Sequence, residues 1–298
     1  MPFFSVVIPT YNQAKYLKAS VDSVLSQSYK NFEIIIIDNY STDETQKIIK
    51  KYKSKKIRTI KFRNKGIIGA SRNLAIKNSK GQWIAFLDSD DMWFTNKLQI
   101  IFEEINKNKN VKVFCSNELL ENLEDEKKKL WFYGPYTNSF YDYLLNNGSC
   151  IATSASVVDK NILKKEKIFF NEKKEFVTAE DFDFFLNIAK RGYKFKFLDN
   201  ILGKRLIHNE SMSSRHDFHK KAINSVYKKH VLKKYKNLCM QKIALFRFAF
   251  PVLLMDLRFF LLKKKDYLKS INLLLFMIIF YPIKSIRFFF RKIKLFVF

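Results

Sequence analysis

Three carboxylates follow an apolar run near the end of the first third of the chain. The run, WIAFL at 83–87, has the length of a buried strand and leads into Asp88, Asp90 and Asp91. Because side chains alternate along an extended chain, we expect Asp88 and Asp90 to point to the same side. Two carboxylates that close repel each other, and a divalent cation would keep both ionised. The alternative is a polar loop after a strand, which we would favour for an isolated Asp-x-Asp motif.

Polar residues also follow the first two predicted strands. Thr10, Tyr11 and Asn12 come after FSVVIP, and Asp38 and Asn39 stand at the end of FEIIIID. In open parallel sheets, ligands bind outside the carboxyl ends of the strands. Three strand ends with convergent polar groups therefore predict one crevice, whose carboxylates suit a metal ion that holds a diphosphate. This coincidence outweighs the polar-loop alternative.

The elements that must position these residues alternate between strand-like and helix-like patterns over residues 3–116. The predicted strands are FSVVIP, FEIIIID, IRTIKF at 57–62, WIAFL and VKVFCS. Apolar residues at helical spacing predict a helix after the first strand, a capping box Ser41-x-x-Glu44 opens a second, and GASRNLAIKNSKG predicts a third that ends at Gly81. This alternation predicts an α/β fold with a Rossmann-like, mostly parallel sheet and flanking helices.

The segment 117–178 is less regular, and its charged run ENLEDEKKK indicates a solvated helix or loop. After it, Glu180 and Asp181 open a predicted helix whose apolar face holds Phe184, Phe185 and Ile188. Acids in the first turn of a helix interact favourably with its dipole, so a purely structural role for both is a real alternative to a catalytic one.

Composition narrows the class of protein. The chain has 298 residues, a hydrophobic share of 47% and a formal net charge of +27, which excludes a disordered protein and favours an anionic partner: nucleic acid, a phosphate-bearing ligand or an acidic membrane surface. Cys115, Cys150 and Cys239 are widely spaced and form no CxxC, so neither a disulfide framework nor a zinc site is expected, and a reducing cytosol fits best.

The N-terminal segment MPFFSVVIP lacks the pattern of a signal peptide and is interpreted as a first strand.

The character of the chain changes from about residue 239. Basic residues far outnumber the two acids, Asp256 and Asp266, and they alternate with Phe, Leu and Ile. The longest apolar stretch, 273–282, has about half of the ~20 residues that span a bilayer. The pattern favours helices that lie in an anionic leaflet with snorkelling Lys and Arg; a helical core subdomain or an oligomer interface is the alternative.

Six motifs in order resemble those of family 2 glycosyltransferases, which have the GT-A fold. VVIPTYNQAKYL, IIIDNYSTDET, GASRNLAI and FLDSDD resemble the N-terminal domain of that family, AEDFDFFLNIAKRG resembles its later ED motif, and KRLIHNESMS resembles its Arg…His…Ser segment. The resemblance covers about residues 3–215. It implies a GT-A domain at 1–215, with a nucleotide-binding half at 1–116 and an acceptor-binding half at 117–215. Residues 216–298 would form a helical, membrane-associating region.

The resemblance also implies a nucleotide-sugar donor, a divalent metal (Mn²⁺ or Mg²⁺) and transfer to an acceptor hydroxyl with inversion at the anomeric carbon. Carried over residue by residue, it implies that the nucleobase or donor is bound by Pro9, Thr10, Tyr11, Asn12, Asp38, Asn39 and Ser89. Arg72 would contact the diphosphate, and Asp88 the ribose or the donor sugar. Asp90 and His208 would bind the metal, with Arg205 and Ser211 nearby, and Asp181 would be the catalytic general base, with Glu180 beside it.

The chemistry asks for the same residue types. Breaking the bond between a sugar and a diphosphate puts negative charge on the leaving oxygens, which a metal and Arg72 would stabilise, and a carboxylate must take the proton of the incoming hydroxyl. The chain departs from the family at Asn39, where an acid often reads uracil, so UDP is the expected but not the only nucleotide. Tyr40 replaces a glycine and is expected to narrow the pocket.

The leading hypothesis is a metal-dependent inverting glycosyltransferase that uses a UDP-sugar and acts on a glycan or lipid-linked acceptor in bacterial surface-glycan synthesis (lipopolysaccharide, capsule or a related polysaccharide). We expect it in the cytoplasm, peripheral on the inner face of the cell membrane. Nucleotidyl transfer is another enzymatic alternative, but the sequence contains no glycine-rich phosphate loop of the kind that this reaction would use. The remaining alternative is a basic membrane- or nucleic-acid-binding protein without transferase activity; no nucleic-acid partner is expected, because the basic residues follow no groove-reading module.

Overall fold

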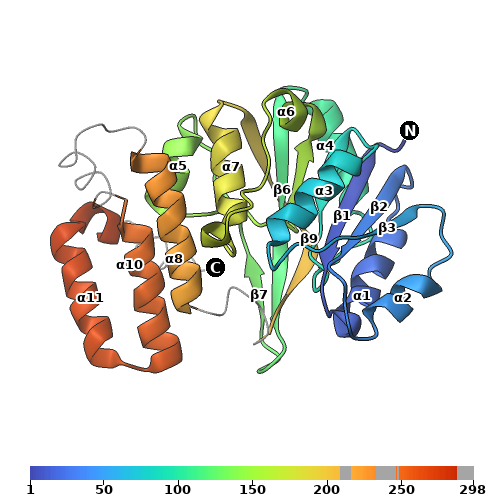
Figure 1. Cartoon of the computed structure of the whole chain (residues 1–298). Helices are drawn as coiled ribbons and strands as arrows, with labels where there is room; N and C mark the ends of the chain where they lie inside the picture. Colours follow the sequence, from blue (N-terminus) through green and yellow to red (C-terminus); the bar gives the residue numbers. More distant parts are fainter. Residues whose placement is uncertain (209–215, 233–245, 247, 287–298) are drawn as a thin grey trace.

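A nine-stranded sheet forms the centre of the computed structural model, which describes residues 1–208, 216–232, 246 and 248–286, apart from the side chains of residues 262 and 263 (Figure 1). The strand order is β3-β2-β1-β4-β8-β6-β9-β5, and β7 pairs with β6. Ser211 and Cys239, named above, lie outside the described residues.

The first part of the sheet is parallel, as predicted. Its elements are β1 (Phe4–Thr10), α1 (Ala14–Leu25), β2 (Phe32–Asp38), α2 (Thr45–Lys51), β3 (Ile57–Lys61), α3 (Ile68–Asn78) and β4 (Trp83–Phe86). The register sets Thr10 beside Asp38, and Val7 beside Phe86. The carboxyl ends of β1, β2 and β4 therefore lie next to one another at one edge of the sheet.

Helices cover both faces of these strands. Alternate residues of β1 and β2 enter two separate cores: Val7 and Ile35 belong to one, Val6 and Ile34 to the other. A strand that buries both of its faces needs a continuous apolar sequence, which FEIIIID supplies.

The second part of the sheet is mixed. It contains β5 (Met92–Trp93), α4 (Lys97–Lys107), β6 (Val111–Asn122), β7 (Lys128–Trp131), α5 (Phe140–Asn147), β8 (Ser156–Asp159), α6 (Lys160–Lys165), η1 (Lys174–Phe176), α7 (Glu180–Lys190) and β9 (Lys194–Ile207). β8 runs antiparallel to both β4 and β6, and β9 runs parallel to β6. The predicted α/β class with flanking helices is confirmed, whereas parallel pairing is confined to β1–β4 and to β6 with β9. An apolar run reveals a buried strand but not its neighbours.

The charged run at 121–129 forms part of a β-hairpin. The two ends of the run lie in strands, so the prediction of a solvated helix or loop was wrong for those ends. Glu121 of β6 lies opposite Lys128 of β7, and Lys204 of β9 forms an ion pair with Glu121 at 2.5 Å. Opposite charges on neighbouring strands stabilise such pairs, so a charged sequence can extend an edge of the sheet into solvent.

The C-terminal region begins with α8 (His216–Tyr227) and the π-helical turn η3 (Lys228–Leu232), beyond the predicted boundary at residue 215. Ala222, Val226 and Val231 of this segment join the first core, and Lys229 and His230 both contact the buried carboxylate of Asp183 on α7. The α8 segment is thus packed against the same core as the sheet.

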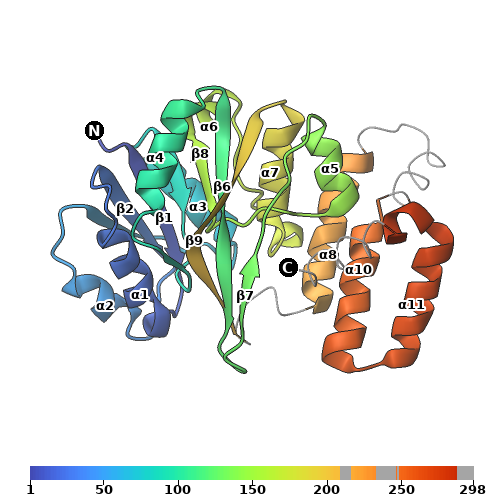
Figure 2. The same cartoon turned by 180° about the vertical axis from the view of Figure 1, so that it is seen from behind.

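A pair of helices lies at the end of the molecule opposite β3 (Figures 1 and 2). It consists of α10 (Phe250–Arg258), the π-helical turn η4 (Phe259–Lys264) and α11 (Tyr267–Phe280). Its small core joins Phe250, Met277 and Tyr281. Among the described residues, each helix is too short or too polar to cross a membrane.

Candidate active site

The ends of β1 and β2 present buried polar atoms that have no partner among the described residues. Asp38 is buried, and its Oδ1 accepts hydrogen bonds from the backbone N–H and the hydroxyl of Ser41, at 2.9 and 2.6 Å. Its Oδ2, like the Oγ1 of Thr10, is buried without a hydrogen bond within that part of the chain. Because such atoms cost free energy when they stay unpaired, their position at the strand ends favours a polar ligand there. Pro9 is buried within β1, opposite Ile37.

Asn12 holds two loops together. Its Oδ1 accepts from the backbone N–H of Thr42 at 2.8 Å, and its own N–H donates to the hydroxyl of Ser41 at 3.0 Å. Its φ of 50° lies in the left-handed region, which asparagine tolerates better than most residues. The neighbouring Tyr11 remains 53% exposed, so its ring is available as a stacking surface at the sheet edge.

The predicted capping box at Ser41 and Glu44 was wrong. The helix α2 begins at Thr45, and the Ser41 hydroxyl contacts Asp38 and Asn12 in place of a helix terminus. Asp43 accepts from the N–H groups of Thr45 and of Ala14, at 3.0 Å each. The loop after β2 is therefore folded back on the strand ends, where the predicted nucleotide-binding residues lie.

Asn39 and Tyr40 show how this loop differs from the family pattern. Asn39 Oδ1 accepts from the backbone N–H of Asn64 at 2.9 Å. Tyr40 has a φ of 56°, so the left-handed backbone that suits the family's glycine is kept although a tyrosine stands there. Its ring is 43% exposed and lies under the guanidinium of Arg63, 4.8 Å from the ring centroid. That the ring narrows the nucleotide pocket stays a prediction.

Arg72 of α3 joins the end of β4 to the start of α7. Its side chain is 4% exposed, with one terminal nitrogen 2.6 Å from Asp88 Oδ1 and the other 2.7 Å from Glu180 Oε1. Burial lowers the pKa of the guanidinium, but these two carboxylates raise it further, and the net shift is upward. Both terminal nitrogens thus bind carboxylates, and the contact with a diphosphate that the resemblance implied stays a prediction.

Both carboxylate oxygens of Glu180 accept hydrogen bonds from within the protein. Besides Arg72 at Oε1, its Oε2 accepts from the backbone N–H of Thr178 at 2.8 Å, and the residue is 5% exposed. A Cβ added at Gly69 would stand 3.0 Å from Phe170 Cβ and 3.1 Å from the carbonyl oxygen of Asn171, so a glycine of α3 lets this segment lie close to the helix. These contacts show that Glu180 positions α7; a catalytic role for it stays a prediction.

Asp181 is the acid of this pair that reaches partly into solvent. Its Oδ1 accepts from the N–H of Phe182 at 2.7 Å. Burial raises the pKa of Asp181 and Asp88 adds to the rise, while Arg72, the Phe182 N–H and Arg205 oppose it; the net direction is upward. A carboxylate whose pKa is raised toward neutrality is better suited to take a proton from a hydroxyl.

The acids of FLDSDD lie in a turn rather than along the strand. β4 ends at Phe86, and the N–H of Asp91 donates to the carbonyl of Asp88 at 3.1 Å. The expected alternation of Asp88 and Asp90 on an extended chain was therefore wrong. Asp88 faces Arg72, its N–H donates to the hydroxyl of Ser154 at 3.0 Å, and Ser89 is buried.

Asp91 points inward, away from a metal role. It is 4% exposed and accepts from the backbone N–H of Leu206 at 3.2 Å. Burial, followed by the charges of Asp90 and Glu118, raises the pKa of Asp91 well above its usual range. Of the three acids, only Asp90 then remains for the predicted metal.

Asp90 and His208 meet across the site although 118 residues separate them. His208 Nε2 lies 3.0 Å from Asp90 Oδ2, and the imidazole ring stacks on Tyr16 with 5.0 Å between centroids. Within the described ranges, no group of three or more His, Cys, Asp or Glu side chains is arranged to hold a metal by itself. An oxygen and an imidazole nitrogen still fit a Mn²⁺ or Mg²⁺ ion that takes its other ligands from substrate phosphates and water.

A buried lysine beneath the turn was missed by the sequence analysis. Lys97 of α4 is fully buried; its Nζ donates to the carbonyl of Ser154 at 2.9 Å and lies 4.8 Å from the ring of Trp93. Burial lowers the pKa of Lys97 to about 8, against the opposing charge of Glu118. A lysine on an amphipathic helix predicts a solvated side chain, so no pattern could have revealed this contact.

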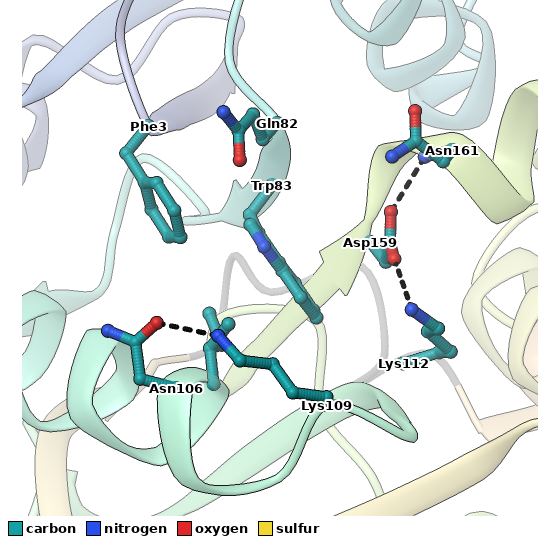
Figure 3. Close-up of a pocket in the computed structure, with 9 residues that line it drawn as sticks. Phe3, Gln82, Trp83, Asn106, Lys109, Lys112, Asp159 and Asn161 are labelled. Atoms are coloured by element: carbon teal, nitrogen blue, oxygen red, sulfur yellow. Dashed lines mark hydrogen bonds and ion pairs between the residues drawn. The ribbon is translucent and has the colours of Figure 1, made fainter.

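One hollow of the molecule lies away from these residues. It has a volume of about 210 Å³ and is lined by Phe3, Trp83, Lys112 and Asp159 among others (Figure 3). Phe3 and Trp83 stand at the amino ends of β1 and β4, the edge of the sheet opposite the predicted site. Asp159 there accepts from Lys112 Nζ at 2.9 Å and from the N–H of Asn161 at 2.8 Å, so the carboxylate in this hollow is already paired.

Replacing Arg72 with methionine should lower the free energy of unfolding by about 3–5 kcal/mol, because Glu180 and Asp88 would be left without their buried cation. Urea denaturation measures the change. Arg58→Met is the matched control: Arg58 is 39% exposed and 3.7 Å from Glu33, so its loss should cost less than about 1 kcal/mol. Equal stability of the two variants would show that Arg72 does not hold the site together.

Known proteins resemble this chain in sequence and in structure. The family model described as glycosyl transferase family 2 matches residues 5–166. The Escherichia coli protein WfaP, named a UDP-Glc:alpha-D-GlcNAc-diphosphoundecaprenol beta-1,3-glucosyltransferase, is 38% identical over 65% of this chain and 73% of its own length.

Two solved structures share the fold. Residues 1–349 of TarS from Staphylococcus aureus, in complex with UDP-GlcNAc, superpose with a TM-score of 0.63 at 20% identity, covering 96% of this chain and 83% of that one. The mannosyltransferase PcManGT from Pyrobaculum calidifontis, in complex with GDP-Man and Mn²⁺, gives 0.58 at 14% identity, covering 100% of this chain and 81% of that one. These matches confirm the predicted GT-A fold.

Proposed function

The chain belongs to glycosyl transferase family 2, and from that premise we propose that it moves a sugar from a UDP-sugar to a hydroxyl of a lipid-linked glycan acceptor. The transfer inverts the anomeric carbon and belongs to the synthesis of a bacterial surface polysaccharide. The named acceptor of WfaP, a sugar on diphosphoundecaprenol, and the UDP-GlcNAc in the TarS complex support these choices of acceptor and donor.

One observation carries the proposal: Arg72 binds Asp88 and Glu180 at the same time. This bridge brings the strand ends of the donor half beside the first turn of α7, where Asp181 stands. The Oδ2 of Asp38, which has no hydrogen-bond partner among the described residues, and the exposed ring of Tyr11 supply a polar and an aromatic contact for a nucleobase. We keep Thr10, Asn12 and Asn39 as supports of that pocket.

The proton of the acceptor hydroxyl passes to Asp181. Its partly exposed carboxylate and its raised pKa suit a base that acts on the side of the sugar opposite the leaving diphosphate. Because the attack and the departure occur in one displacement, the configuration at the anomeric carbon inverts. Glu180 and Arg72 fix the direction of α7 and hence of this carboxylate.

Asp90 and His208 would hold a divalent metal together with the donor diphosphate. Such an ion supplies positive charge to the leaving phosphate oxygens. Asp90 is held by the turn that starts at Asp88, and His208 is held by its stacking on Tyr16. With the ion bound, these two residues would hold the donor diphosphate in place.

Isothermal titration tests the proposal. The full chain is titrated with UDP-sugars, GDP-mannose and a dTDP-sugar, each with and without Mn²⁺. We expect UDP-sugar binding that Mn²⁺ strengthens. Absence of metal-dependent binding for every donor would refute a nucleotide-sugar transferase, and preference for a guanine or thymine nucleotide would refute UDP as its carrier.

We propose further that the pair α10–α11 rests on an anionic membrane surface, which would keep the protein in the cytoplasm, peripheral on the inner face of the membrane. Exposed apolar side chains recur along one stripe of α11 and the residues after it: Leu268, Ile271, Leu275, Ile279 and Ile283. Leu268 is 71% exposed and Ile279 68%, with Lys264, Lys265, Lys269 and Lys284 nearby in sequence. Apolar residues that insert beside lysines that attract lipid phosphate are typical of an interfacial helix.

Flotation with liposomes measures this attachment. The double variant Leu268→Glu with Ile279→Glu should lower the bound fraction on phosphatidylglycerol vesicles by at least about tenfold, because two charges would enter the apolar layer. Leu123→Glu, at a 39% exposed residue of the β6–β7 hairpin, serves as the control. Equal binding to neutral and anionic vesicles, or unchanged binding of the double variant, would contradict the proposal.

A further inference from the structure

A second hollow of about 610 Å³ lies between the segment 132–136, which follows β7, and residues 195–199 at the start of β9. We call it the aromatic groove. Phe132, Tyr133 and Tyr136 line it from one segment, and Phe195 and Phe197 from the other. Asp199 adds a negative charge at the rim, whereas the Nζ of Lys196 forms an ion pair with Glu104 of α4 at 2.6 Å. Aromatic rings and one carboxylate thus converge on one concave surface. Its volume falls in the range of about 300–1,000 Å³ that is usual for ligand sites.

The wall of the aromatic groove is preformed. Gly134 has a φ of 89°, and a Cβ at this position would stand 2.8 Å from Phe197 Cγ, so a glycine is required for the segment to lie against that ring. The N–H of Tyr133 donates to Asn117 Oδ1 at 2.9 Å, and the ring of Phe197 contacts that of Phe140, with 5.7 Å between centroids. A ligand would meet these rings already in place.

Tyr133 connects the aromatic groove to the candidate active site. Its hydroxyl donates to Glu118 Oε2 at 2.6 Å. Burial and then Glu118 raise the pKa of Tyr133, while Arg205 opposes them. The charge of Arg205 also acts on Asp91 and on Asp181, where it opposes the rise in the pKa of each carboxyl. Arg205 therefore stands within electrostatic reach of the groove wall, the acidic turn and the base.

We propose that the aromatic groove binds a sugar ring of the acceptor, next to the ring whose hydroxyl is attacked. The proposal rests on the function proposed above and names a subsite for it. A pyranose has an apolar face of C–H bonds that stacks on an aromatic ring, and its hydroxyl groups bond to charged side chains at the rim, here the carboxylate of Asp199. Phe132 is the exposed ring of the groove, at 56%, and offers a face for such stacking.

The carboxylate of Asp199 at the rim of the aromatic groove favours a sugar over a lipid tail as the ligand. An isoprenoid chain would gain nothing from Asp199, which is exposed beside the rings, whereas a sugar hydroxyl can donate to its carboxylate. The groove is built from residues 132–199, the part of the chain that also carries Asp181, and a ligand there would belong to the acceptor side of the reaction. A sugar of the acceptor glycan satisfies both conditions.

Kinetics with a synthetic acceptor test the subsite. The probes are GlcNAc-α-diphosphate with a short alkyl chain and the same compound extended by one further sugar. Phe132→Ala should raise KM for the extended probe about five- to tenfold, through loss of ring contact, and leave the donor affinity unchanged. Phe132→Tyr should restore the wild-type KM, because it keeps the ring. Leu130→Ala, at a 45% exposed residue of β7 outside the groove, controls for disturbance of the hairpin.

Saturation-transfer NMR of the extended probe, without donor, reads binding independently of activity. We expect saturation on the protons of the added sugar in the wild type and its loss in Phe132→Ala. Saturation confined to the alkyl chain, an unchanged KM in Phe132→Ala, or an equal loss in Phe132→Tyr would overturn the subsite. Failure of the donor titrations would instead remove the proposed function, while the NMR result would still decide whether this groove binds a sugar.

Discussion

Replacing Asp181 with asparagine is expected to lower kcat for sugar transfer by about 10²- to 10⁴-fold, the usual contribution of a general base. The amide keeps the shape of the side chain and can still accept the hydrogen bond from the N–H of Phe182, so α7 should begin as before. It cannot take a proton. Donor affinity in the titration with Mn²⁺ should therefore stay at the wild-type value, and stopped-time assays of product give the rate.

Asp217→Asn is the matched control for this variant. Asp217 is an exposed acid in the first turn of α8, as Asp181 is an acid in the first turn of α7, so both changes remove a charge that favours a helix N-terminus. Only Asp181→Asn should lower the rate of transfer. Should Asp181→Asn lose donor binding together with activity, Asp181 would belong to the donor site and another group would have to act as base.

The pH dependence of transfer follows from the same carboxyl group. Its pKa in the folded protein is raised, chiefly by burial and by Asp88, and a base works only when deprotonated. The rate should therefore be complete above that raised pKa and fall as the pH drops through it, at a higher pH than for an ordinary aspartate. A profile of kcat/KM in the wild type measures this limb, and the residual activity of Asp181→Asn should lack it.

The sequence alone was sufficient to predict where the site residues at the ends of single strands lie. Runs such as FEIIIID predicted buried parallel strands, and the polar residues after them were found at one edge of the sheet because parallel strands end together. The helix α7 also begins where its pattern placed it, at Glu180. Local patterns carry this information, since each depends on residues that are close in the chain.

What the sequence could not reveal are contacts between residues far apart. Arg72 and Glu180 are 108 residues apart, and nothing near either one indicates that they share a buried ion pair. Likewise, the acids after β4 were expected along an extended strand, whereas hydrogen bonds to Ser154 and within the turn fold them back. Glu180 is bound within the protein, whereas Asp181 reaches partly into solvent. This difference depends on such distant partners, so only the structure could reveal it.

Asp90→Ala should remove the metal-dependent part of donor binding. In the wild type, titration of a UDP-sugar should give a stronger affinity with Mn²⁺ than without it; in the variant, the two affinities should coincide, and transfer should be lost. The reason is that Asp90 is the one acid of its turn left to a metal: Asp88 is held by Arg72, and Asp91 is buried against the backbone of β9. The fold should survive, because the Asp90 side chain is 24% exposed.

The pairing with His208 sharpens this prediction. If Asp90 and His208 bind the same ion, His208→Ala should also abolish the Mn²⁺ effect, and the double variant should lose no more than either single one, since residues that act through one ligand are not additive. Asp125→Ala, at a partly exposed acid of the β6–β7 turn, is the control for lost negative charge. Mn²⁺ that still strengthens donor binding to Asp90→Ala would mean that the metal is held elsewhere, and additive losses would mean that Asp90 and His208 act separately, so that the 3.0 Å contact between them serves the fold and not the reaction.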